Sequence, residues 1–380
     1  MRLISIDVLR TVAIVMMVLV HFVENLSSGS GPAADTAIGP DHRWWLPTGL
    51  AAPLFALLSG VSYRAWLAAL QRRGIASETI SKRTIRRGLF LIGLGFAFNV
   101  FVWLPEDTFN WDILTFIGSA LMLLDVVRRM PTAVPPVLIL LVVLLSPALQ
   151  LLADYQAYWT RAYFDYDMTL TDVLLGYLVV GYFPIFPWLV FPVAGFVIAP
   201  LLLTEPHAAG HAGGSNDQRR LAFGVGLLAL ASLLLQGLAG NLSGVGRWTM
   251  FPASTRYLLG MLALAIASLL VLHRLLDAPA ASAQRLPPTD RQSRLAACFQ
   301  VISRHSLSLY LLHHVVHIWP LWIYGLATAG EPTVHWRTLL PVPVAVALAM
   351  LFCAASVPLV LLADRCGWPT VEKVMRWLSD

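Results

Sequence analysis

ISIDVLRTVAIVMMVLVHF, residues 4–22, is long and apolar enough to cross a bilayer as an α-helix. It nevertheless carries Asp7, Arg10 and His21, ionisable groups that are costly in hydrocarbon. His21 follows Arg10 by about three helical turns and Asp7 precedes Arg10 by about one, so the three side chains share one stripe of the helix. We expect such a stripe to face the protein interior or a wet cavity rather than lipid.

The composition of the whole chain is that of an integral membrane protein. Of the 380 residues, 58% are hydrophobic and 12% are charged, whereas about a quarter of the residues of a soluble domain are charged. Recurring apolar runs predict an all-α bundle of about ten transmembrane helices, forming one domain over residues 1–380. The predicted spans are 3–24, 47–70, 86–104, 111–127, 133–153, 182–204, 220–239, 254–273, 297–323 and 339–363.

The charges of the loops predict an orientation. Lys and Arg collect in alternate loops, most densely between the second and third predicted spans, and the positive-inside rule therefore places both termini in the cytoplasm. No basic stripe interleaved with aromatic residues is present, which argues against nucleic-acid binding. The three cysteines are far apart and form no CxxC motif, so neither a disulfide framework nor a cysteine zinc site is expected.

The stretch RLISIDVLRTVAIVMMVLVHF (2–22) resembles the first helix of the transmembrane acyltransferase superfamily. This superfamily includes acyltransferase-3 enzymes, YeiB/DUF1624-type bacterial proteins and heparan-α-glucosaminide N-acetyltransferases. Their helix reads S-[IL]-D-x-x-R-G-x-A, with a His or Asn eleven residues after the Arg; here Thr11 replaces the Gly. Later segments resemble the family in the expected order, namely PLFALLSGVSYR (53–64), DILTFIGSALML (112–123), YFPIFPWLVFPVAGFVIA (182–199) and RHSLSLYLLHH (304–314).

The resemblance implies an enzyme that carries an acyl group, most simply acetyl, across a membrane. The donor would be cytoplasmic acetyl-CoA, and the acceptor a sugar amine or hydroxyl presented from the outer side, so that O- and N-transfer both stay open. It implies a multi-pass protein of the bacterial inner membrane. The expected partners are acyl-CoA, a sugar or amine acceptor, the lipid bilayer and a second copy of the chain in a homodimer, and no nucleic acid.

A general base must take the acceptor's proton, and histidine suits this role near neutral pH. The resemblance offers two candidates, His21 in the first span and His42 before the second. Asp41 is adjacent to His42, and Trp44 and Trp45 could stack on a sugar ring or lie at the membrane interface. The sequence leaves open which imidazole is the base and which positions or polarises.

Cations are needed for the phosphates of the donor. Arg83, Arg86 and Arg87 are spaced i, i+3 and i+4, so they cluster on one helix surface, and a guanidinium fork suits phosphate. They are equally typical of interfacial anchors. Arg10 is a further candidate inside the cavity.

Four further residues are candidates for the lining of the reaction cavity and the acceptor site, namely Asp7, Asp112, Tyr310 and His313. His313 and His317 have the i, i+4 spacing of metal ligands, but the sequence shows no third ligand, so no metal is expected.

Two other functions fit the same residues. A transporter or exporter of a small solute would line its path with the polar stripe and would not turn over acyl-CoA. A catalytically degenerate subunit of a membrane complex is the other alternative, since Thr11 and Thr115 stand where the family pattern has Gly and His.

Overall fold

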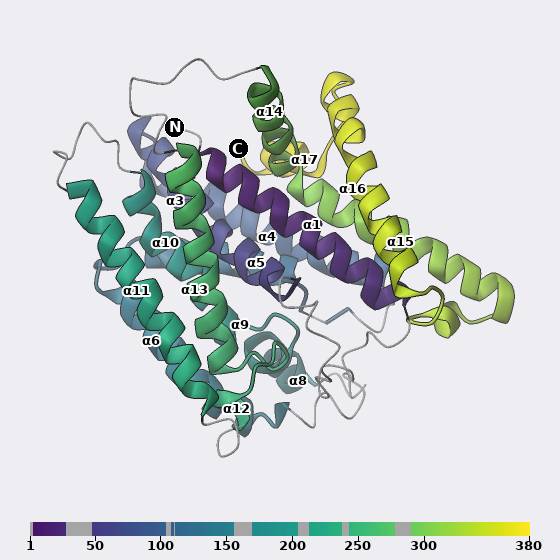
Figure 1. The fold of residues 1–380 in the computed structure, drawn as a ribbon, viewed down its shortest axis with the longest axis horizontal. Coiled ribbons are helices and arrows are strands. Elements are labelled where there is room, and N and C mark those ends of the chain that lie inside the picture. Colours follow the sequence, from purple (N-terminus) through teal and green to yellow (C-terminus); the bar gives the residue numbers. More distant parts are fainter. Residues whose placement is uncertain are drawn as a thin grey trace. The chain divides into compact units, whose positions relative to one another are not determined.

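The computed structural model describes residues 3–27, 48–103, 108–109, 111–155, 169–203, 213–237, 243–277 and 290–380. The chain divides into two compact units. Unit 1 contains residues 53–282 with 1–2 and 378–380, and unit 2 contains 3–52 and 283–377. Among the described residues, every named secondary-structure element is a helix (Figure 1), which confirms the predicted all-α class. The single domain over 1–380 stays a prediction.

Unit 1 is built from helices that pack in neighbouring pairs. α4 contacts α5, α11 contacts α13, and α6 contacts α10. The helices are α3 (Ala51–Arg72), α4 (Ser77–Val102), α5 (Ile113–Val127), α6 (Val134–Leu152), α8 (Leu170–Leu175), α9 (Ile185–Trp188), α10 (Val190–Leu203), α11 (Gly213–Gln236), α12 (Ser243–Gly246) and α13 (Thr255–Leu272).

Unit 2 is organised around the first helix. α1 (Ile4–Leu26) contacts α14 (Asp290–Arg304), α15 (Ser306–Ala329) and α16 (Val342–Arg365). In Figure 1, α1 is the purple helix that crosses behind the yellow α16. The short helix α17 (Val371–Ser379) follows α16.

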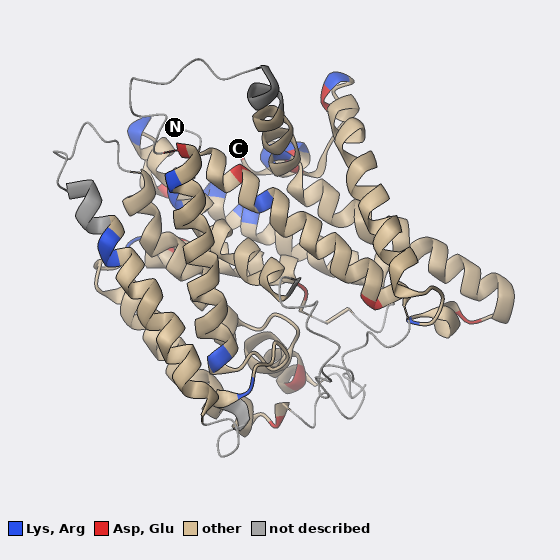
Figure 2. Cartoon of the chain, viewed as in Figure 1, with Lys and Arg blue, Asp and Glu red and all other residues tan. Residues whose placement is uncertain are grey.

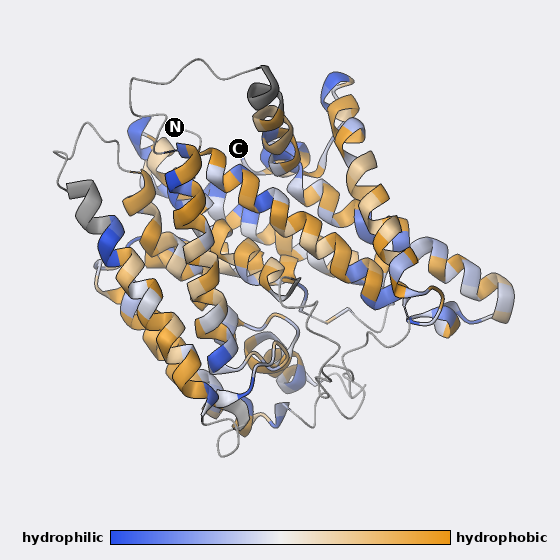
Figure 3. Cartoon of the chain, viewed as in Figure 1, coloured by the Kyte–Doolittle hydropathy of each residue, from blue (hydrophilic) through white to orange (hydrophobic). Residues whose placement is uncertain are grey.

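The lengths and compositions of these helices confirm a multi-pass membrane protein. Among the described residues, eight helical segments are long and apolar enough to span a bilayer, and a ninth is formed if α14 and α15 count as one bent span. α5 is apolar but shorter. Figures 2 and 3 show the same division within single helices: α11 and α13 are almost free of charge and strongly apolar over most of their length, with Arg near their ends.

The predicted single span 297–323 is instead two helices that meet at an angle of 75°. The break lies at His305, whose backbone leaves the helical region (φ −106°, ψ 24°). Its Nε2 lies 3.0 Å from an oxygen of Asp364, and the carboxylate of Glu372 accepts hydrogen bonds from Ser308 N (2.8 Å) and Ser308 Oγ (2.7 Å). The carboxylate of Glu372 at the N-terminus of α15 thus satisfies a backbone amide that a continuous helix would have bonded internally.

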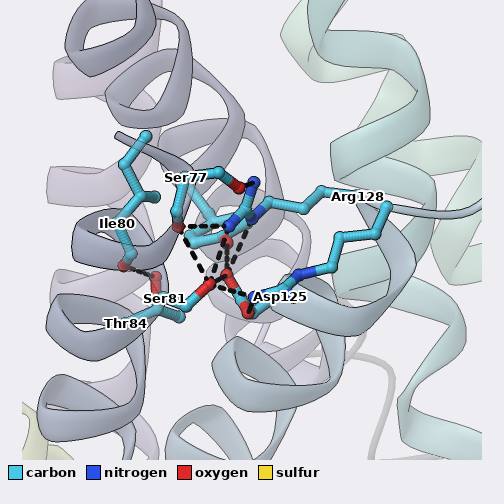
Figure 4. A network of polar contacts seen from close by, with 8 residues as sticks. Ser77, Ile80, Ser81, Thr84, Asp125 and Arg128 are labelled. Atoms are coloured by element: carbon cyan, nitrogen blue, oxygen red, sulfur yellow. Dashed lines mark hydrogen bonds and ion pairs between the residues drawn. The ribbon is translucent and has the colours of Figure 1, made fainter. Parts of the chain in front are cut away.

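A buried ion pair ties α4 to α5 in unit 1 (Figure 4). Asp125 on α5 accepts hydrogen bonds from Arg128 Nε (2.7 Å), Ser81 Oγ (3.1 Å) and Tyr63 Oη (3.3 Å), and its second oxygen lies 3.0 Å from Arg129 Nη2. Only 5% of the Arg128 side chain and 6% of the Asp125 side chain are exposed. Sequence reasoning did not identify this network.

The close packing of α3 on α10 explains two glycines in the family-like segments. A Cβ on Gly60 would lie 1.9 Å from the carbonyl oxygen of Pro192, and one on Gly195 would lie 2.0 Å from that of Leu57. Neither contact can be relieved by a side-chain movement, because both carbonyl oxygens belong to the backbone. Small residues that let two backbones touch are a common device of membrane helix pairs.

We expect Gly60→Ala to destabilise unit 1 by about 3 kcal/mol or more, since the added methyl group forces α3 and α10 apart. The midpoint of thermal unfolding in detergent measures this. Gly93→Ala is the matched control, because a Cβ at Gly93 on α4 meets no atom within 4 Å. An equal midpoint for the two variants would contradict the packing argument.

Candidate functional site

The polar stripe of α1 lies against α14 and α15 inside unit 2. Arg10 Nη1 donates a hydrogen bond to Ser303 Oγ at 2.8 Å. Asp7 is buried, with 3% of its surface exposed, and its backbone carbonyl accepts from Thr11 Oγ1 at 2.9 Å. The carbonyl of Phe299 on α14 also accepts from Thr11 Oγ1, at 3.4 Å. Thr11 therefore bonds to both α1 and α14, a role that a glycine at this position could not fill.

Further along the stripe, His21 meets a group of imidazoles on α15. His21 Nδ1 lies 2.9 Å from His313 Nε2, and the His21 ring packs 4.4 Å from that of His314, centroid to centroid. His313 and His314 are almost completely buried, with 0% and 1% of their surface exposed. His317 lies one turn further along α15 and is also buried. Residues from the two ends of the chain thus form one buried cluster.

Backbone carbonyls fix which nitrogens of the cluster carry hydrogen. His313 Nδ1 lies 3.2 Å from the carbonyl of Leu309, and His314 Nδ1 lies 3.1 Å from that of Tyr310. A carbonyl oxygen only accepts, so both Nδ1 atoms must donate, and in neutral imidazoles both Nε2 atoms then carry a lone pair. His21 Nδ1 must in turn donate to His313 Nε2, which leaves His21 Nε2 as an acceptor.

The side-chain amide of Asn25 borders the histidine cluster at the C-terminal end of α1. Asn25 Nδ2 donates to His317 Nε2 at 3.0 Å and to the carbonyl of His21 at 2.9 Å. Asn25 Oδ1 accepts from Trp336 Nε1 at 2.9 Å. Sequence reasoning missed Asn25, His314 and Trp336, although Asn25 lies four residues after His21 and so on the same helix face.

Tyr310, a predicted cavity residue, belongs to this cluster. It is buried, with 2% of its surface exposed, and its ring lies edge-on to that of His313, with 5.7 Å between centroids. The structure therefore brings together three predicted residues, His21, Tyr310 and His313, whereas Arg10 lies about three turns away along α1, against Ser303 of α14.

The predicted phosphate-binding arginines lie on α4 in unit 1. Arg87 Nη2 lies 3.2 Å and Arg83 Nη1 3.8 Å from the same carboxylate oxygen of Asp380. The Arg87 guanidinium also stacks 4.5 Å above the ring of Trp66. Arg86 is exposed. Arg83 and Arg87 thus converge on one anionic group, as their helical spacing predicts.

The remaining predicted site residues belong to unit 1 or lie outside the described residues. Asp112 is the N-cap of α5, where its Oδ2 accepts from Leu114 N at 3.4 Å. Asp41, His42, Trp44 and Trp45 lie outside the described residues.

Many helices able to span a membrane, and buried polar residues on the first of them, define the described part of the chain as a polytopic membrane protein with a polar interior. A family model described as heparan-alpha-glucosaminide N-acetyltransferase, catalytic, matches residues 2–236, more than half of the chain. The chain therefore belongs to this family of membrane acetyltransferases, which confirms the resemblance drawn from the sequence. No curated protein matches the chain. The match includes α1 and residues 41–45 but ends before α14 and α15, which supply Ser303 and His313.

Proposed function

We propose that the protein transfers an acetyl group from cytoplasmic acetyl-CoA to an amine or hydroxyl of an extracytoplasmic acceptor, with a sugar amine as the first choice. The observation that carries this proposal is the family match over residues 2–236. The stripe of Asp7, Arg10 and His21 supports it, because burying such groups in an apolar helix is costly unless they serve a purpose.

The chemistry requires one bond to form and one to break at the thioester. The acceptor nitrogen or oxygen attacks the carbonyl carbon, its proton passes to a general base, and the carbon–sulfur bond breaks to release CoA, which takes up a proton. We assign the base to His42, with Asp41 to orient it and Trp44 and Trp45 to stack on the acceptor. His21 then positions or polarises, since its Nδ1 is already bonded to His313.

The donor has two sets of cations in this proposal. Arg83, Arg86 and Arg87 bind the phosphates of CoA at the cytoplasmic surface, and the shared carboxylate at Arg83 and Arg87 supports an affinity of this pair for anions. Arg10, on α1 in unit 2, is a second candidate for binding the donor. Both termini lie in the cytoplasm of a bacterial inner-membrane protein in this arrangement.

Binding and turnover of acetyl-CoA by the purified protein in detergent test the function. We expect acetyl-CoA and CoA to raise the unfolding temperature, and ATP to have little effect at the same concentration. Labelled acetyl-CoA should then acetylate glucosamine or a related amino sugar. An absence of stabilisation at millimolar ligand, together with solute flux in vesicles without CoA release, would favour the transporter instead.

Arg10→Ala should weaken the binding of acetyl-CoA about tenfold or more, because a hydrogen bond to a charged group contributes about 1.5–3 kcal/mol. A titration followed by thermal shift measures the dissociation constant. Ser303→Ala keeps the charge and removes only the partner of the guanidinium, so its effect should be smaller. Arg219→Ala removes an exposed cation on α11 and serves as the control for net charge. Equal affinity in Arg10→Ala and Arg219→Ala would exclude Arg10 from the donor site.

A further inference from the structure

Three imidazoles of unit 2 converge as the ligands of a metal ion do. His21, His313 and His314 each offer a ring nitrogen, and these three atoms lie within 4.8 Å of one another. Imidazole nitrogens bound to a tetrahedral zinc ion are about 3.3 Å apart, given Zn–N bonds of about 2.0–2.1 Å. His21 Nδ1 and His313 Nε2 are 2.9 Å apart, slightly closer than that, and all three atoms lie within 4.8 Å of one another. Side-chain movements, together with loss of the hydrogen from His21 Nδ1, convert the observed cluster into a coordinating one.

The surroundings of His313 and His314 are those of metal-binding histidines. Each donates its Nδ1 hydrogen to a backbone carbonyl one turn earlier, on Leu309 and Tyr310. Such a bond to the nitrogen that does not bind the metal fixes the ring and directs the other nitrogen to the ion. The Nε2 atoms of both residues therefore carry the lone pair, and neither residue has to change its tautomer to bind an ion. The hydrogen bond from His21 Nδ1 to His313 Nε2 is exchanged for the bond to the metal.

The donor atoms also select the kind of ion. Mg²⁺ and Ca²⁺ require oxygen ligands, whereas imidazole suits Zn²⁺ and similar transition metals. Three histidines leave the fourth tetrahedral position for a further ligand. His21 is less buried than the other two, so the open position can face the side of the cluster on which α1 is accessible.

We propose that His21, His313 and His314 form a binding site for a transition-metal ion, best filled by Zn²⁺. The sequence predicts no metal because His313 and His317 lack a third ligand. In the structure His21 on α1 is the third ligand. The second ligand on α15 is His314 and not His317, because the Nε2 of His317 accepts a hydrogen bond from Asn25. The site requires only unit 2 and does not depend on acetyl transfer.

Metal analysis of the full-length protein tests the site directly. After growth with added zinc and purification in detergent, we expect about one zinc ion per chain by mass spectrometry of the metal. After removal of the metal with a chelator, added Co²⁺ should give the visible absorption bands of a tetrahedral site. His313→Gln and His314→Gln should each lower bound metal at least tenfold, and His317→Gln, a buried histidine on the same helix, should keep it.

Two outcomes would overturn the site: wild-type protein with neither bound zinc nor a Co²⁺ spectrum, or full metal content in both His313→Gln and His314→Gln. If these variants fail to fold, the wild-type Co²⁺ spectrum still decides. His42→Ala separates this proposal from the enzymatic one, because it should abolish transfer and leave the metal content unchanged.

Discussion

We expect His42→Ala to lower the proposed turnover of acetyl-CoA by at least about 100-fold, since a positioned general base contributes about 10²- to 10⁴-fold. The release of CoA in the presence of an amino-sugar acceptor measures this rate. Binding of acetyl-CoA, followed by thermal shift, should stay unchanged, because the proposed role of the imidazole is to act on the acceptor and not on the donor. A fall in turnover without a loss of donor affinity is the specific signature of this role.

His335→Ala is the matched control for this experiment. His335 lies in the short helical segment Pro332–His335, where its imidazole is hydrogen-bonded to Thr328. Its removal should keep wild-type turnover. Full activity in His42→Ala with loss of activity in His21→Ala would move the role of base to His21. Full activity in both variants would show that neither histidine is the base and that the mechanism is wrong.

The placement of several spanning helices was predictable because a bilayer imposes a simple rule on length and polarity. About ten spans were predicted, and the described residues contain eight such helices, or nine with the bent pair. The predicted spans 3–24, 133–153 and 339–363 agree with α1, α6 and α16 to within a few residues. The bend at His305 was not predictable in this way. It depends on Asp364 and Glu372, about 60 residues later, and no local pattern reports such a contact.

The candidate site was predictable only in the part that one helix determines. The spacing of Arg10 and His21 placed them on one stripe, and the structure shows them on one side of α1. Their partners come from α14 and α15, nearly 300 residues away, so His314 and Ser303 had no signal in the first span. The pairing of Arg83 and Arg87 with Asp380 is hidden for the same reason.

Asp125→Ala destabilises the protein by about 3–5 kcal/mol, the cost of removing one partner from a buried ion pair. The variant leaves the guanidinium of Arg128 buried without its carboxylate partner. Arg128 Nη1 and Nη2 still donate hydrogen bonds of 3.1 Å to the hydroxyl and the carbonyl of Ser77, but these neutral acceptors cannot compensate the charge. The unfolding midpoint in detergent should fall far below that of the wild type, and the contact of α4 with α5 should be the first lost.

The exposed pair Lys82–Glu78 on α4 is the matched control. Lys82 Nζ lies 2.7 Å from Glu78 Oε1, the same distance as between Arg128 Nε and Asp125 Oδ1. The side chains of Lys82 and Glu78, however, are 65% and 79% exposed. Glu78→Ala should therefore cost less than about 1 kcal/mol. The double variant Asp125→Leu/Arg128→Met should be more stable than Asp125→Ala, because it leaves no buried charge. Equal losses in Asp125→Ala and Glu78→Ala would show that burial does not determine the strength of the Asp125 network.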